Sequence, residues 1–213
     1  MHRLLRAGGL AGLLCICSSV ARAQTIPNLE AQVEAPPRPI SGAERINWIV
    51  DGMLGARSLG VGVLATTWQM SWDTPREWPR SPYGFRQRYL EREADVAISN
   101  TLEAGLGALW GEDPRYFRAP PGRVRARAAH AIKTVILAPR SDGQFKLAWG
   151  RFAGNVVNNV IENAWLPPTM TTPGQAALRS ANGMLGRLAG NLWDEFWPDI
   201  RTRLAHRARH SRE

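Results

Sequence analysis

Apolar residues recur at helical spacing along most of the chain after residue 40. The first such segment opens at Ser41-Gly-Ala-Glu44, which has the form of a helix-capping box, and it continues to Trp68. Because this segment is apolar on most sides, we expect it to form a central helix. A second helix is predicted to open at Ser81-Pro82, with proline at its first position, and to end near Gly111.

A third helix is predicted around residues 134–137. The basic segment 123–133 leads into it, and Pro139 closes it because proline lacks the backbone donor that a helix needs. A turn is expected at 141–144, where serine, aspartate and glycine follow one another. No alternation of apolar and polar residues is long enough to predict a sheet.

The clearest helical pattern runs from residue 149 to residue 165 and stops at two consecutive prolines. The last helix opens at Thr172-Pro-Gly-Gln175, a second capping box, and is expected to kink or end at Pro198. Together these patterns predict an all-α protein, a single compact bundle of about five helices over residues 41–200.

Three segments flank this predicted domain. Residues 1–23 combine a short cationic region with an apolar run and end in Ala21-Arg22-Ala23, the pattern of a signal peptide that is cleaved after Ala23. The apolar run is too short to cross a bilayer. Residues 24–40 are rich in proline and are expected to be a poorly ordered leader, and residues 201–213 form a basic C-terminal tail. We therefore expect export to the periplasm or cell envelope.

The composition excludes several classes of protein. The chain has 213 residues, a formal net charge of +9 and 44% hydrophobic residues, too apolar for a disordered chain and too charged for a protein of many membrane spans. Its only cysteines, Cys15 and Cys17, lie in the predicted signal peptide, which excludes a disulfide framework in the mature chain. No metal-binding motif, serine nucleophile elbow or phosphate-binding loop is present, so we expect no metal and no cofactor.

The densest cluster of polar and aromatic residues is Trp110-Gly-Glu-Asp-Pro-Arg-Tyr-Phe-Arg118, where the second helix ends. In one hypothesis Glu112 or Asp113 is a catalytic base, His130 is its partner, and Arg115 and Arg118 clamp an anion. In the alternative, Asp113 and Pro114 form a turn, the arginines pair with the two carboxylates, and the aromatic residues fill the core.

A second candidate site lies on the predicted helix over residues 149–165. Polar residues share one face of this helix, opposite its valine and tryptophan positions; they are Arg151, Asn155, Asn158, Asn159 and Glu162. Asparagine is a poor helix former, so its repetition indicates hydrogen-bonding partners. The face is predicted to be either a polar groove for a ligand or a network between helices or with water.

Basic residues form two clusters, and nearly all of them are arginine. The first is Arg115, Arg118, Arg123, Arg125 and Arg127, and the second is Arg201, Arg203, Arg207, Arg209 and Arg212. Guanidinium groups bind phosphate bidentately, so the first cluster is a candidate anion-binding or lipid-binding site. For an exported protein the expected partner is a phospholipid or another envelope polyanion and not nucleic acid. The alternative is that the C-terminal tail is a frayed, solvated helix end whose arginines lie favourably near the helix dipole.

Glycines four residues apart occur at Gly107 and Gly111, at Gly150 and Gly154, and at Gly186 and Gly190. This spacing lets two helices approach closely. Because charged or polar residues accompany each pair, we expect tight packing within a soluble domain in preference to association inside a membrane.

The Glu-Asp-Pro-Arg-Tyr-Phe-Arg run resembles a group of secreted bacterial proteins, together with Gly84-Phe85, His130-Ala131 and Asn163-Ala-Trp165. The resemblance covers roughly residues 84–168 and implies an exported envelope protein; it implies no activity and no catalytic residue. The hypothesis from sequence is therefore a non-catalytic binding or structural protein, peripheral to an anionic membrane surface. The alternative is a hydrolase or lipid-modifying enzyme that uses Glu112, Asp113 and His130.

Overall fold

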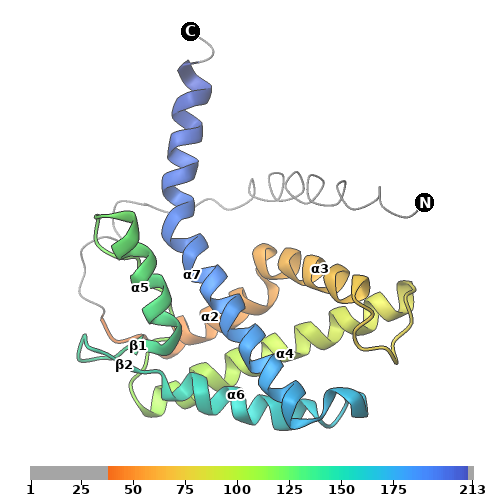
Figure 1. Ribbon diagram of the computed structural model, residues 1–213. Helices are drawn as coiled ribbons and strands as arrows, with labels where there is room; N and C mark the ends of the chain where they lie inside the picture. Colours follow the sequence, from red (N-terminus) through yellow and green to blue (C-terminus); the bar gives the residue numbers. More distant parts are fainter. Residues whose placement is uncertain (1–37, 211–213) are drawn as a thin grey trace.

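The computed structural model describes residues 38–210. Its elements in chain order are α2 (Gly42–Leu54), α3 (Ala56–Ser71), α4 (Pro82–Leu109), α5 (Val124–Ile136), β1 (Leu137–Pro139), β2 (Phe145–Leu147), α6 (Trp149–Glu162), the 3-10 helix η2 (Pro168–Met170) and α7 (Pro173–His210). The predicted all-α fold is confirmed, and the helices pack into a compact bundle (Figure 1). The predicted signal peptide and most of the predicted leader lie outside the described residues.

The long helix α4 and the shorter helix α6 lie side by side along one side of the bundle (Figure 1). The helices α2 and α3 pack against α4, and α5 packs against α7. The C-terminal part of α7 stands clear of the other helices (Figure 1). The polar side of α6 is therefore enclosed between α4 and the N-terminal part of α7.

Glycine permits the close approach of α4 and α6. A Cβ atom built on Gly150 would lie 2.5 Å from the Cα atom of Gly107, and one on Gly154 would lie 3.2 Å from the backbone nitrogen of Glu103. The predicted tight packing thus holds for these three glycines. Gly111 instead forms a turn with a φ of +67°, which a side chain rarely adopts.

The first predicted helix is two helices in the structure. The capping box forms as predicted, because Ser41 Oγ accepts from the Glu44 backbone at 3.2 Å and the Glu44 carboxylate accepts from the Ser41 backbone at 2.9 Å. The helix breaks at Gly55, whose backbone is extended. The expectation of a central helix is wrong for α2, which has no buried residue and exposes Ile46, Val50 and Leu54.

The third predicted helix, α5, begins at Val124 and ends at Ile136, so the basic segment belongs to it. The residues up to Pro139 form β1 instead, and β1 pairs antiparallel with β2 in the register Leu137 with Leu147. The expectation of no sheet was wrong here, because strands of three residues are too short to show an alternating pattern. The predicted turn joins the two strands, with Gly143 at a φ of +76°.

The last helix, α7, does not end at Pro198 but continues to His210. Residues 201–210 of the predicted basic tail are therefore helical and continuous with the domain. The exposed apolar residues Ile200 and Leu204 lie among the exposed arginines Arg201, Arg203 and Arg207. This part of α7 therefore carries both apolar and basic exposed residues, and it does not pack against the bundle (Figure 1).

Candidate functional site

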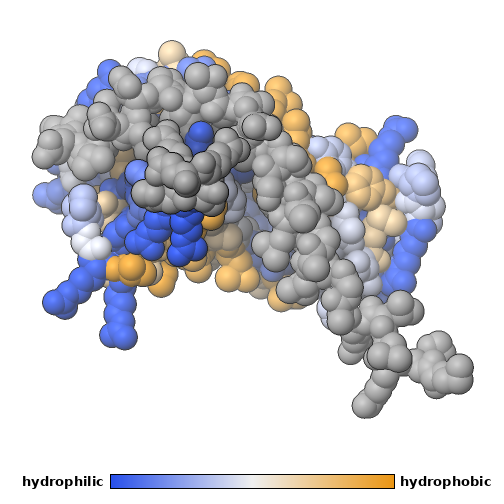
Figure 2. Space-filling model, turned by 90° about the horizontal axis from the view of Figure 1, so that it is seen from above, coloured by the Kyte–Doolittle hydropathy of each residue, from blue (hydrophilic) through white to orange (hydrophobic). Residues whose placement is uncertain are grey.

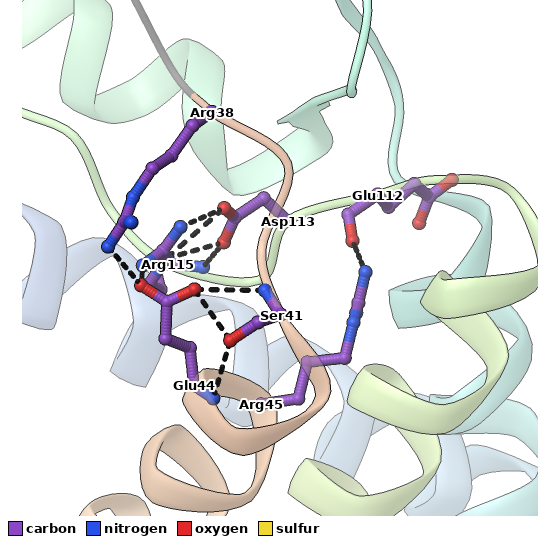
Figure 3. Close-up of polar contacts among 7 residues, drawn as sticks. All are labelled: Arg38, Ser41, Glu44, Arg45, Glu112, Asp113 and Arg115. Carbon is purple, nitrogen blue, oxygen red and sulfur yellow. Dashed lines mark hydrogen bonds and ion pairs between the residues drawn. The ribbon is translucent and has the colours of Figure 1, made fainter. Parts of the chain in front are cut away.

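Glu112 is a helix cap in the structure. Its two carboxylate oxygens accept hydrogen bonds from the backbone nitrogens of Trp149 and Gly150, both at 2.8 Å, at the N-terminus of α6. Its backbone carbonyl accepts from Arg45 at 2.6 Å (Figure 3). A carboxylate at this position satisfies two helix donors that have no partner in the helix and lies at the positive end of the helix dipole.

Asp113 points away from the Glu112 carboxylate and faces arginine (Figure 3). Its oxygens accept from Arg115 Nε at 3.0 Å and from Arg115 Nη2 at 2.7 Å. Arg115 also contacts the Glu44 carboxylate at 3.2 Å, and Glu44 in turn pairs with Arg38 at 2.9 Å. Hydrogen bonds from Ser41, together with the charges of Arg115 and Arg38, lower the pKa of Glu44 to about 2.

His130 lies apart from both carboxylates. Its Nε2 atom is 2.9 Å from the Phe117 carbonyl oxygen, and its ring packs against Tyr116 and Phe145. Glu112, Asp113 and His130 thus have separate partners and do not converge. The predicted pairing of arginine with carboxylate forms between Arg115 and Asp113 only. Glu112 instead accepts from backbone nitrogens, and Arg118 pairs with Asp199.

Two arginines of the first basic cluster also face carboxylates. Arg127 contacts Glu195 and Asp199, both at 2.6 Å, and Arg118 contacts Asp199 at 2.8 Å. Glu195 is fully buried and also accepts from the hydroxyl of Tyr116 at 2.7 Å. Burial raises the pKa of Glu195, but the hydrogen bonds from Tyr116 and Arg127 outweigh burial and leave it lowered.

Arg123 and Arg125 differ from the other members of this cluster. Both are exposed near the start of α5, and neither has an ion pair within the described residues. Of the predicted anion-binding residues, these two are the ones whose guanidinium groups are directed to solvent.

The polarity of α6 is inverted. The exposed fractions of Val156 and Val160 are 65% and 66%, whereas those of Asn158, Asn159 and Glu162 are 3%, 8% and 1%. The predicted polar face is therefore the face that packs inside the molecule, and the apolar face is at the surface. Figure 2 shows apolar residues at the surface of the bundle beside strongly hydrophilic ones.

Asn158 links α6 to α4. Its Nδ2 atom donates to the Asp95 carboxylate at 2.6 Å and to the Glu162 carboxylate at 3.0 Å. Burial raises the pKa of Glu162 to about 8, and a hydrogen bond between the Glu162 and Asp95 carboxyl groups, together with the charges of Asp95 and Glu91, acts in the same direction. Burial and the charge of Asp95 raise the pKa of Glu91 to about 7.

Asn155 and Asn159 link α6 to α7. Asn159 donates to Ser180 at 3.1 Å, and Ser180 donates to Asn155 at 2.5 Å. Arg179 Nε donates to the Asn159 side chain at 3.0 Å and lies 2.9 Å from Glu162 Oε2. The predicted network between helices is present, and α7 supplies two of its members.

Arg151, the remaining residue of the predicted polar face, joins a separate network. It contacts Glu103 of α4 at 3.0 Å and donates to the carbonyl oxygens of Thr134 and Val135. Glu103 also pairs with Arg187 of α7. Burial lowers the pKa of Arg151 to about 10, and the charge of Arg187 acts in the same direction.

A large open groove of about 2890 Å³ runs between α3, α4, α6 and α7. The groove is lined by polar members of the α6 network and by aromatic residues: Glu91, Asp95, Asn158, Glu162, Arg179, Trp68, Trp72 and Trp193. Glu112, Asp113 and His130 do not line it. Within residues 38–210, no histidine, aspartate and glutamate side chains are grouped so that they could hold a metal ion.

Four charged residues with interior partners, one of them fully buried, were not identified from the sequence. Arg88 is fully buried and organises the loop before α4 by donating to the carbonyl oxygens of Thr74, Pro75, Trp78, Pro79 and Gly84. Glu91, Asp95 and Arg179 were missed because their partners are distant in sequence. The spacing of Glu91 and Asp95, which places both on one face of α4, was the available signal.

The chain was compared with family models, with curated proteins and with solved structures, and none of the three comparisons finds a match.

Proposed function

We propose that the protein is an exported, non-catalytic protein of the bacterial envelope that binds the surface of a phospholipid membrane. The inverted polarity of α6 carries this proposal. A helix that buries asparagine and glutamate and exposes valine gains little from facing water, because apolar surface is stabilised by leaving water. Contact with the apolar part of a lipid surface would remove the exposed valine side chains from water.

The outer face of α6 has the features of a helix that lies in a membrane interface. Trp149 at its start and Trp165 just beyond its end are both exposed, and Val156, Val157 and Val160 are exposed between them. Tryptophan is favoured at the level of the lipid head groups. With 14 residues the helix is about 21 Å long, which suits a position along the membrane plane better than a span across it.

The segment 42–71, which comprises α2 and α3, also supports membrane contact. It is long and apolar enough to cross a membrane by length and composition. Its charged residues Asp51 and Arg57 line the groove, and Arg57 pairs with Asp194 of α7. The exposed apolar residues Ile46, Val50 and Leu54 do not line the groove, so they can contact lipid without carrying these two charges into it.

Exposed arginines supply the charge that an anionic lipid surface needs. Arg123 and Arg125 lie at the start of α5, and Arg201, Arg203 and Arg207 lie on the projecting part of α7. Each basic residue near an anionic membrane contributes about 1 kcal/mol to binding. Apolar contact and arginine together predict binding that salt weakens but does not abolish.

Fractionation of the native host tests the proposal. We expect the protein in the membrane fraction, partly released by 1 M salt and largely released by carbonate. Recovery in untreated periplasmic extract as a monomer, or as a dimer whose interface covers α6, would overturn the proposal.

Flotation with vesicles separates the two contributions. The double substitution of Val156→Asn and Val160→Asn should lower binding to phosphatidylglycerol vesicles at least tenfold in both low and high salt. The triple substitution of Arg201, Arg203 and Arg207 by glutamine should lower it only in low salt. Asp142→Asn, on the exposed turn of the hairpin, is the matched control and should leave binding unchanged.

A further inference from the structure

Three carboxyl groups and one guanidinium group lie together in the groove beside α6. Glu91 and Asp95 of α4 and Glu162 of α6 meet there, and Arg179 of α7 is the guanidinium group whose charge acts on them. A cluster of carboxylates is not by itself evidence of a binding site. Acceptor atoms that have no hydrogen-bond donor would be independent evidence.

Two buried acceptors in this cluster have no hydrogen-bond donor within residues 38–210. These acceptors are Asn158 Oδ1 and Glu162 Oε2, and both residues line the groove. The nearby Arg179 Nε carries a single proton, and it donates that proton to Asn159. Its 2.9 Å approach to Glu162 Oε2 is therefore an ion pair without a hydrogen bond.

Unpartnered buried acceptors are costly, about 1–3 kcal/mol each. Asp95 and Glu162 both accept a hydrogen bond from the Nδ2 atom of Asn158. The oxygens around this position are therefore acceptors that need donors. A further group at this position must donate hydrogen bonds and must carry positive charge. An anion or an apolar group would satisfy neither condition.

We infer that this end of the groove is a binding site for a primary ammonium group, held by Asn158, Glu162 and Asp95. A primary ammonium has three N–H donors and one positive charge, which matches the vacant acceptors and the excess of carboxylates. A quaternary ammonium has the charge but no donor. Tryptophan and leucine residues elsewhere along the groove would contact an apolar substituent of the amine.

The titration of the cluster supports the same assignment. Burial raises the pKa of Glu91 to about 7 and that of Glu162 to about 8, so each carboxyl holds a proton in mildly acidic solution. An ammonium group would displace these protons, because it stabilises the charged carboxylates. The charged groups that face the cluster are Glu91 and Asp95 from α4, Glu162 from α6 and Arg179 from α7.

Calorimetric titration of the purified protein tests the inference with four probes. Ethanolamine and choline are the free compounds, and short-chain, water-soluble phosphatidylethanolamine and phosphatidylcholine are the corresponding lipids. At pH 8.5 we expect the two primary amines to bind at least tenfold more tightly than their quaternary counterparts. Equal affinity for ethanolamine and its lipid would assign a free amine, and tighter binding of the lipid would assign a head group.

Proton release and variants complete the test. Titrations in HEPES and in phosphate, two buffers without a primary amine, should show net proton release on binding at pH 7.5. Glu162→Gln should weaken amine binding at least tenfold and reduce the proton release, whereas Asp142→Asn should change neither. Glu91→Gln serves as a second variant, and circular dichroism checks that each variant is folded.

Three outcomes would overturn the inference: no binding of either primary amine at millimolar concentration, equal binding of the choline probes, or unchanged affinity in both folded variants. The site does not depend on membrane attachment. Glu162→Gln should float with vesicles as the wild type does, so failure of one proposal is distinguishable from failure of the other.

Discussion

A buried glutamate lies at each end of α6. The two carboxylates differ in their hydrogen-bond donors and in their position relative to the helix dipole. Glu112 and Glu162 have exposed fractions of 3% and 1%. Glu112 lies at the N-terminus, where two backbone nitrogens donate to it and the helix dipole is positive. Glu162 is the last residue of the helix, where the dipole is negative, and one of its oxygens has no donor among the residues that the structure describes.

The comparison teaches that burial and residue type do not identify a site. Both glutamates lie beside a second carboxylate, Asp113 in one case and Asp95 in the other. At Glu112 and Asp113 every carboxylate oxygen has a donor from the chain itself, so this region holds the fold together. At Glu162 the chain leaves acceptors vacant beside a groove, and this region is the one available to a ligand.

The largest expected effect that tests this comparison is at Glu112. Glu112→Gln removes a charge and one of two acceptors at the N-terminus of α6, and it should lower the free energy of unfolding by about 3 kcal/mol. Denaturant unfolding at pH 7 measures the change. Glu77→Gln, at an exposed glutamate that accepts from Thr169, is the control and should change stability by less than about 0.5 kcal/mol. Equal effects at the two positions would contradict the capping role.

The next effect is the pH dependence of the wild type. A carboxyl whose pKa is raised by folding holds its proton more tightly in the folded state, so its stability contribution is complete below pH 4.5 and is lost as pH rises through the folded value. With Glu91 at about 7 and Glu162 at about 8, unfolding should become easier between pH 5 and pH 8.5. We expect the free energy of unfolding to fall steadily over this range. A free energy of unfolding that is flat over this range would show that neither carboxyl is perturbed.

Glu162→Gln should act in the opposite direction from Glu112→Gln. At pH 8.5 glutamine replaces a largely ionised and incompletely satisfied carboxylate, so the variant should be more stable than the wild type. At pH 5 the wild-type group is protonated and the difference should vanish. Thermal unfolding at both pH values measures it. A destabilised variant at pH 8.5 would place Glu162 in the same structural class as Glu112.

Sequence reasoning predicted the helices well because their signals are local. The capping box at Ser41 and the proline at the start of α4 are contained within a few residues, and both form. The polar face of α6 was also identified, but not its inward direction, because an amphipathic pattern reads the same whichever face is buried. Asp95 lies 63 residues from its partner Asn158, and no local pattern links them. The hairpin β1–β2 was missed because its strands are three residues long.

The smallest expected effect concerns Ser41 and extends the comparison to a third helix terminus. Ser41→Ala removes the hydroxyl that accepts from the Glu44 backbone and should lower the free energy of unfolding by about 1 kcal/mol.

The same hydroxyl of Ser41 donates to the Glu44 carboxylate, whose pKa of about 2 depends on Ser41. Because this pKa is lowered by folding, its contribution is complete above pH 4.5 and is lost as pH falls through 2, the reverse of Glu162. Ser41→Ala should therefore bring acid unfolding to higher pH while leaving the decline between pH 5 and pH 8.5 unchanged. An effect on the alkaline side would mean that the two carboxylate regions are coupled and that the contrast between them is not local.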